Sequence, residues 1–176
     1  MKTIKQLLIT IAVLLCSATT YAYDFEVDGI YYNIISSEDL TVKVTDGDNE
    51  YSGEVVIPST VNYNGEVYSV ISIGGSAFSG CSSLTSIEIP NSVTSIGEDA
   101  FYNCSSLASI EIPNSVTTIR GGTFYNCDSL TSIEIPDSVI SIEYYYDGSH
   151  NGAFQGCSNL KTLTFGENSG TIHNFV

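Results

Sequence analysis

A block of 23 residues recurs through the middle of the chain and constrains its fold more than any other feature. The segment Phe78–Pro90, FSGCSSLTSIEIP, returns as FYNCSSLASIEIP at Phe101–Pro113 and as FYNCDSLTSIEIP at Phe124–Pro136. A degraded copy, FQGCSNLKTLTF, occupies Phe154–Phe165. Because a fixed period of about 20 to 50 residues is typical of chains whose repeats stack around one continuous core, we expect a repeat solenoid.

Each repeat predicts one coil of that solenoid. Polar and apolar residues alternate through Ser86–Ile89, which is the period-2 pattern of a strand buried on one face. Pro90 ends this strand, and Val93 and Ile96 place a second apolar pair on the return side. The segment that begins with Ala100 and Phe101 is too short for a full helix and predicts a single helical turn or a 3₁₀ piece. We therefore expect a mostly β structure with short helical turns.

The pattern Cys-x-x-Leu-x-x-Ile-x-Ile-Pro-x-x-Val resembles the leucine-rich repeats of the BspA-like family, which occur on surface and secreted proteins of anaerobic bacteria and some mucosal protozoa. The resemblance covers residues 70–165. It implies a leucine-rich-repeat right-handed superhelix with a parallel β-sheet. It also implies adhesion to host matrix proteins or to other bacteria, and no enzymatic chemistry carried by the repeats.

The first 22 residues have the features of a secretory signal peptide. Two lysines precede the apolar run Leu7–Leu15, and a small residue lies before the expected new N-terminus, Tyr23. A lipoprotein signal at Cys16 is disfavoured because a bulky leucine precedes it. No later apolar run is long enough to cross a bilayer. The sequence therefore predicts a secreted or cell-surface protein.

The rest of the chain divides into two expected parts. Residues 23–69 lack the full repeat and predict an N-terminal β cap followed by a first degenerate coil, whose strand and proline are Glu54–Pro58. Residues 70–176 predict the leucine-rich repeat solenoid, with an insertion at 143–152. A cap that shields the first open sheet edge is a common requirement of repeat arrays.

Two segments of the expected cap have strand-like composition. They are residues 24–35 and 40–44, with turn residues at Asp28-Gly29 and Asp46-Gly47.

The charge of the chain restricts the class of partner. All 20 acidic residues follow Ala22 but only three basic ones do, so the exported form carries a net charge of 3 − 20 = −17. Nucleic acids and anionic membranes would be repelled. The charge is compatible with simple solubility, with a basic partner, or with bound cations.

Four cysteines occupy one repeat position, three residues after each repeat phenylalanine: Cys81, Cys104, Cys127 and Cys157. Stacked coils would place neighbouring cysteines about 4.8 Å apart, which alone does not forbid a disulfide. Side chains that point the same way into a core are poorly oriented for one, so we expect a column of buried free thiols. No second ligand recurs nearby, so no metal site is predicted here.

The outward positions of the strands are the first candidate binding site. They form two columns, Ser86, Ser109, Ser132 and Thr162, and Glu88, Glu111, Glu134 and Thr164. Stacked glutamates repel one another, and a basic partner or a cation such as Ca²⁺ would relieve that repulsion. The alternative is a solvated polar face that keeps the sheet soluble.

The second candidate is the insertion, which contains Tyr144, Tyr145 and Tyr146. Tyrosines are enriched in recognition surfaces, and excursions from a rigid scaffold often carry function. The alternative is that these rings cover the last coil as a cap. The two histidines, His150 and His173, have no triad or metal spacing, so neither catalysis nor a cofactor is expected.

These features predict a secreted or cell-surface module for binding or adhesion to an extracellular or host protein. Two alternatives remain open. One is a structural role in which the last coil stacks end to end on another chain. The other is glycan binding, with Tyr144–Tyr146 as stacking platforms.

Overall fold

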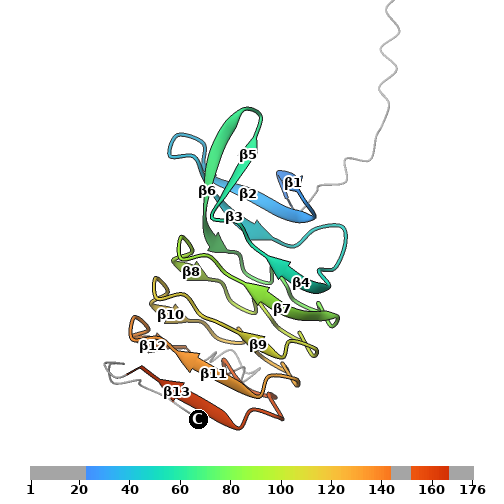
Figure 1. Cartoon of the computed structure of the whole chain (residues 1–176), viewed down its shortest axis with the longest axis vertical. Coiled ribbons are helices and arrows are strands. Elements are labelled where there is room, and N and C mark those ends of the chain that lie inside the picture. Colours follow the sequence, from blue (N-terminus) through green and yellow to red (C-terminus); the bar gives the residue numbers. More distant parts are fainter. Residues whose placement is uncertain (1–22, 144–151, 167–176) are drawn as a thin grey trace, which may run out of the picture.

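The computed structural model describes residues 23–143 and 152–166 (Figure 1). This part of the chain forms thirteen strands and no helix. A curled sheet lies at the N-terminal end, and the repeats follow it as a stack of coils (Figure 1).

The N-terminal sheet has the strand order β1-β2-β3-β6-β5. Its strands are β1 (Phe25–Val27), β2 (Ile30–Ser36), β3 (Thr41–Thr45), β5 (Thr60–Tyr63) and β6 (Glu66–Ile73). The expected cap strands at 24–35 and 40–44 are therefore confirmed. The sheet curls so that its two edge strands come together. Phe25 of β1 stacks on Tyr63 of β5, with ring centroids 4.0 Å apart.

Two tight hairpins shape this cap. Asp28 and Gly29, with φ of 52° and 79°, turn β1 into β2, and Asn64 and Gly65, with φ of 51° and 89°, turn β5 into β6. Positive φ at both central residues is the geometry of a type I′ turn, for which Asn-Gly and Asp-Gly are the preferred pairs. The second hairpin is absent from the sequence analysis, although Asn64-Gly65 is a strong signal for it.

Strand β6 belongs to both parts of the molecule. Its first half pairs with β5, whereas Ser72 and Ile73 pair in parallel with Ser95 and Ile96, which form β8 (Ser95–Ile96) of the next coil. The expected boundary between residues 69 and 70 falls inside this strand. The cap is thus joined to the first coil by continuous backbone pairing.

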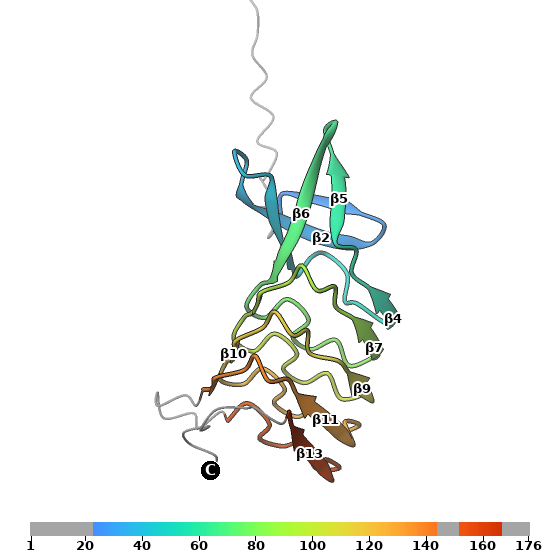
Figure 2. The same cartoon turned by 60° about the vertical axis from the view of Figure 1, so that its left-hand side comes forward.

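One side of the stack carries five strands that follow one another down the molecule (Figure 2). They are β4 (Gly53–Val56), β7 (Leu84–Glu88), β9 (Ser109–Ile110), β11 (Ser132–Ile135) and β13 (Thr162–Phe165). The pairing is parallel, and it joins Val55 to Ile87 and Ile87 to Ile110. Ile133 is likewise paired with Leu163. The match of Glu54–Pro58 to the repeat strand is therefore confirmed.

Short strands β8, β10 (Thr118–Ile119) and β12 (Ser141–Ile142) form the return side. A serine of each repeat reinforces this side by donating its hydroxyl hydrogen to a carbonyl of the preceding coil. Ser92 donates to Val70 and Ser138 to Val116, both at 2.7 Å, and Ser115 donates to Val93. The recurring Ser-Val pair after each proline therefore holds adjacent coils together.

The core of the stack is a column of repeat phenylalanines, Phe78, Phe101, Phe124 and Phe154, here called the phenylalanine ladder. Successive ring centroids are 5.2, 5.5 and 5.4 Å apart, with interplanar angles of at most 11°. Tyr51 covers the N-terminal end of the ladder, with its ring centroid 4.5 Å from that of Phe78. The expected register, in which like side chains of successive repeats meet, is thereby confirmed.

The expected short helical turns are confirmed only in part, because each is a single hydrogen-bonded turn and the described residues contain no helix. The segment after each phenylalanine ladder residue forms single turns, such as that closed by Cys104 N–H donating to Phe101 O at 3.2 Å. Asp99 and Asn103 adopt φ of 53° and 58°, in the left-handed region, immediately before and after Ala100–Tyr102. Since a residue in the left-handed region interrupts a right-handed helix, only one turn fits between them.

The four cysteines are free thiols, as expected. Each of the last three donates its S–H to the carbonyl of the phenylalanine one coil earlier: Cys104 to Phe78 at 3.0 Å, Cys127 to Phe101 at 3.2 Å and Cys157 to Phe124 at 2.9 Å. Burial raises the pKa of the Cys104 thiol to about 12. The thiols therefore act as small apolar groups that also tie neighbouring coils together.

Candidate binding surface

The strand face is the surface formed by the outward side chains of β4, β7, β9, β11 and β13. Parallel pairing places Ser86 beside Ser109, and it places Ser132 and Glu134 beside Thr162 and Thr164. The predicted columns of hydroxyls and carboxylates therefore lie on one face. Pairing of β4 with β7 extends both columns toward the cap, because Glu54 lies beside Ser86 and Val56 beside Glu88.

The hydrogen-bonded sheet under these columns is in two pieces. One piece has the order β4-β7-β9 and the other consists of β11 and β13. Strand β9 ends at Ile110, so Glu111 and Ile112 lie beyond it. Among the described residues, no backbone pairing joins β9 to β11. The identical Ser-Ile-Glu-Ile-Pro segments thus separate at their carboxyl ends.

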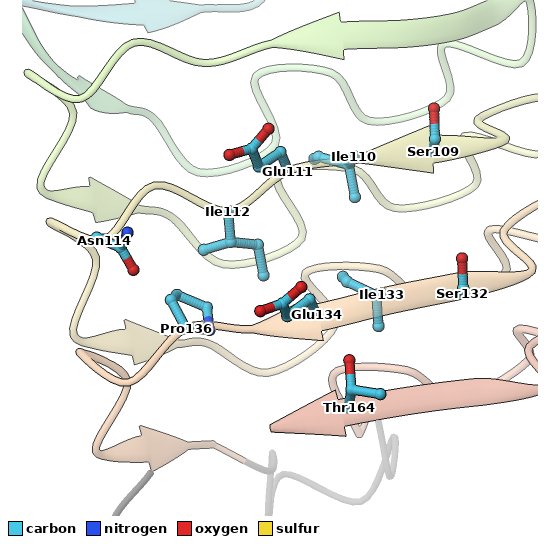
Figure 3. Close-up of a pocket in the computed structure, with 10 residues that line it drawn as sticks. All are labelled: Ser109, Ile110, Glu111, Ile112, Asn114, Ser132, Ile133, Glu134, Pro136 and Thr164. Carbon is cyan, nitrogen blue, oxygen red and sulfur yellow. The ribbon is translucent and has the colours of Figure 1, made fainter. Parts of the chain in front are cut away.

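Two hollows occupy the places where the coils separate. One has a volume of about 590 Å³ and lies between Ile87–Asn91 and the coil of Ser109–Pro113. The other, of about 510 Å³, lies between the coil of Ser109–Asn114 and that of Ser132–Pro136, with Thr164 at its far side (Figure 3). Glu111 lines both hollows, so they adjoin along one coil.

The chemistry of these hollows is acidic and hydroxylic over an apolar base. Glu88, Glu111 and Glu134 are exposed, whereas Ile110 and Ile133 behind them are buried. No lysine, arginine or histidine lines either hollow. Like charges on neighbouring coils repel one another, and the repulsion weakens where the coils separate. A positively charged ligand would relieve this repulsion.

Within residues 23–143 and 152–166, no group of three or more His, Cys, Asp or Glu side chains is placed to hold a metal ion. The same ranges contain no helix capable of crossing a bilayer. The two histidines, His150 and His173, lie outside the described residues, as do Tyr144, Tyr145 and Tyr146 of the insertion.

The insertion begins beside a surface ion pair. Arg120 Nη1 lies 3.5 Å from Glu143 Oε2, and both side chains are partly exposed. An exposed pair of this kind contributes at most about 1 kcal/mol to stability. The pair therefore gives little evidence of a binding role.

Val56 is a further member of the strand face, which the repeat glutamates alone do not predict. This side chain is 61 % exposed and lies beside Glu88 at the position of the glutamate column. The alignment of Glu54–Pro58 with the repeat contains this information, because it places Val56 opposite the repeat glutamate. The column therefore changes from apolar to acidic between the first coil and the second.

The sequence and the fold both match known leucine-rich repeat proteins. The model of the BspA type leucine rich repeat region, in six copies, matches residues 55–176, and so begins earlier than the resemblance at 70–165. No protein with curated information matches this chain.

Three solved structures are informative. A leucine-rich repeat protein from Bacteroides ovatus is 36 % identical, with a TM-score of 0.70 over 81 % of this chain and 41 % of that protein. One from Bacteroides capillosus is 30 % identical, with a TM-score of 0.65 over 81 % of this chain and 97 % of that protein. A leucine rich cell surface protein from Faecalibacterium prausnitzii is 26 % identical, with a TM-score of 0.56 over 84 % of this chain and 44 % of that protein.

The chain thus spans less than half of the Bacteroides ovatus and Faecalibacterium prausnitzii proteins but nearly all of the Bacteroides capillosus one. The family model covers more than half of the chain, and neighbouring repeat strands pair in parallel. The chain belongs to the BspA-type leucine-rich repeat family.

Proposed function

We propose that this protein is a secreted or cell-surface binding module whose strand face recognises a basic region of an extracellular protein. The observation that carries the proposal is the pair of adjoining hollows lined by Glu88, Glu111 and Glu134 without a basic side chain. The stacked coils fix the backbone positions of the three glutamates before the partner arrives, which lowers the entropy lost on binding.

Three further observations support a surface location and a binding role. The solved structure from Faecalibacterium prausnitzii is described as that of a cell surface protein. Residues 1–22 have the composition of a secretory signal. The large excess of acidic residues favours a partner of opposite charge and speeds its association.

The test replaces all three column glutamates at once, as Glu88→Gln, Glu111→Gln and Glu134→Gln. The control carries Glu38→Gln, Glu66→Gln and Glu98→Gln, which change the net charge equally at exposed sites elsewhere. Both variants are applied, with the wild type, to an array of extracellular matrix proteins and glycans at low and physiological salt.

We expect the wild type and the control to bind the same basic proteins, and the column variant to bind them at least tenfold more weakly. The column variant should also be slightly more stable to urea, because three like charges are removed from neighbouring coils. Equal loss of binding by both variants would show that net charge alone is responsible and would contradict the proposal.

Glycan binding and end-to-end assembly are separate predictions with different outcomes in the same set of measurements. Glycan spots that retain the wild type and both variants equally would favour a glycan ligand bound outside the glutamate column. A mass that rises with protein concentration would favour assembly. The right-handed superhelical path implied by the family stays a prediction.

A further inference from the structure

Strand β4 is the first strand of the strand-side sheet, and one of its edges has no neighbour. The sheet order is β4-β7-β9, and within the described ranges β4 pairs with β7 alone. The unpaired edge of a sheet presents backbone groups that can pair with another chain. The cap does not continue this sheet, since its own strands pair among themselves and with β8.

The direction of the backbone groups in β4 is fixed by its bonds to β7. Gly53 N–H donates to Ser83 O at 2.9 Å, and Ile57 N–H donates to Glu88 O at 3.0 Å. Because backbone groups alternate sides along a strand, those of Glu54 and Val56 point away from β7. No other described residue forms a hydrogen bond with the backbone of Glu54 or Val56.

Space for a further chain lies along this edge. A hollow of about 350 Å³, here called the edge hollow, is lined by Glu54–Val56 on one side and by Asp28–Tyr31 and Asn49–Ser52 on the other. It is separate from the two hollows between the repeat coils, with which it shares no lining residue.

The far wall of the edge hollow is held in place by hydrogen bonds. Tyr51 Oη accepts from Tyr31 N–H at 3.0 Å and donates to Thr45 O at 2.7 Å. Asn49 Nδ2 donates to Tyr31 Oη at 3.1 Å. Since these contacts join the wall to β2 and to the end of β3, the hollow is preformed.

The side chains along the edge specify the chemistry of an added strand. Side chains on paired strands interact across the sheet when they lie opposite one another on the same face. Glu54 and Val56 are exposed on that face, and Val56 is 61 % exposed. A basic side chain opposite Glu54 would therefore pair with its carboxylate, and an apolar side chain opposite Val56 would pack against it.

Charge also distinguishes a foreign partner from a second copy of this chain. Asp28 and Glu50 join Glu54 in the lining, and no basic residue lines the edge hollow. A second copy of the exported form carries the same net charge of 3 − 20 = −17 and would be repelled. An extended basic segment would be attracted.

We propose that the free edge of β4 is a strand-addition site, which pairs through its backbone with an extended partner segment carrying a basic and an apolar side chain two residues apart. The backbone of Glu54 and Val56 supplies the hydrogen bonds, and their side chains select the residues opposite. This site uses the backbone edge of β4 and the edge hollow, which shares no lining residue with the hollows of Glu88, Glu111 and Glu134, so either site can fail without the other.

The variant that tests the site is Val56→Pro. Proline removes the N–H that points into the edge hollow, and its ring blocks approach of another strand. It leaves the bonds from Gly53 and Ile57 to the next coil, because proline is tolerated where the strand N–H faces solvent. The matched control is Val56→Thr, which keeps both the N–H and the branched side chain.

The probe is a fluorescent, end-blocked hexapeptide of sequence Thr-Lys-Thr-Val-Thr-Lys, with binding followed by anisotropy on the full chain. Three comparison peptides carry glutamate in place of lysine, or N-methyl groups on one or the other set of alternate amides. We expect the wild type and Val56→Thr to bind the probe, and Val56→Pro to bind it at least tenfold more weakly. The glutamate peptide and one of the two N-methylated peptides should lose binding to a similar extent.

Hydrogen exchange on the wild type keeps the test decisive if Val56→Pro does not fold. Addition of the probe should slow exchange at the amides of Glu54 and Val56, which have no hydrogen-bond partner among the described residues of the free protein. Absence of binding, or binding insensitive to N-methylation in either set, would overturn the proposal. A wild-type dimer abolished by Val56→Pro would also overturn it, because the occupant would then be a second copy.

Discussion

Replacement of Phe101 by alanine should be among the most destabilising single changes in the stack. Phe101 is fully buried and stacks on both neighbours, with centroids 5.2 Å from Phe78 and 5.5 Å from Phe124. Truncation of a buried phenylalanine costs about 3 to 5 kcal/mol through lost burial and the cavity left behind. Because the ladder has partners on both sides here, we expect a value near the upper end, about 4 to 5 kcal/mol.

The assay is urea unfolding followed by far-ultraviolet circular dichroism. With a slope of about 2 kcal/mol per molar urea, a loss of about 4 kcal/mol lowers the midpoint by about 2 M. The matched control is Phe154→Ala at the end of the ladder, where the ring is only partly buried and stacks on Phe124 at 5.4 Å. The Phe154→Ala variant should lose about half as much free energy of unfolding, roughly 2 kcal/mol.

The difference in stability loss between the two variants tests whether the ladder is continuous. A larger effect in the middle than at the end is expected if the rings form one continuous column. Equal effects, or a loss below about 1 kcal/mol for Phe101→Ala, would refute the idea that the ladder stabilises the stack as a whole.

Three other predictions concern the thiols, the buried titratable groups and the left-handed turns. Alkylation at pH 8 should modify Cys157 first, because this thiol is only partly buried and a hydrogen bond with the neighbouring thiol lowers its pKa. Mass spectrometry of early time points measures the order of modification, and early reaction of the buried Cys104 would contradict the prediction. Burial raises the pKa of Cys104 from 9.0, and that of Tyr32 from 10.0, to about 12. Because both groups therefore ionise first in the unfolded chain, the melting temperature should fall between pH 9 and 12. A melting temperature that stays constant over this range would contradict the burial of these two groups. Asn126 has φ of 55° and donates from Nδ2 to Asn103 Oδ1 at 3.0 Å. Asn126→Ala should lower the free energy of unfolding by about 1 to 2 kcal/mol, and Asn126→Gly by clearly less. Equal losses in the two variants would show that the side-chain hydrogen bond matters rather than the backbone conformation.

The sequence predicts the repeating part of the fold well because its information is periodic. The spacing of Phe78, Phe101 and Phe124 predicts a stack, and the rings are stacked as expected. The alternation through Ser86–Ile89 predicts a strand with a buried and an exposed face, which β7 shows. A repeated pattern can satisfy its buried groups only by stacking in register, so few other structures compete with it.

The details that differ between repeats are not encoded locally. Ser-Ile-Glu-Ile occurs in three repeats, yet it gives a strand of two residues in β9 and of four residues in β11. The difference arises from pairing with neighbouring coils, which the local sequence does not contain. The hollows beside Glu111 follow from this separation, and they could not be predicted from the repeats.

The left-handed residues beside each turn and the covering of the ladder were not predicted, for a different reason. The left-handed conformations of Asp99 and Asn103 restrict the turn between them, and neither residue type requires that conformation. Tyr51 lies outside the repeat, and its contact with Phe78 spans the junction between cap and stack. Such long-range contacts depend on how the cap packs, which sequence periodicity does not describe.

The register of the stack is the claim on which the strand face, the hollows and the free edge of β4 all depend. The most direct test is a nuclear Overhauser experiment on a sample in which only phenylalanine rings are protonated. Contacts between Phe78 and Phe101, Phe101 and Phe124, and Phe124 and Phe154 are expected, at separations near 5 Å. A contact between Phe78 and Phe124, or the absence of contacts between successive rings, would contradict the account.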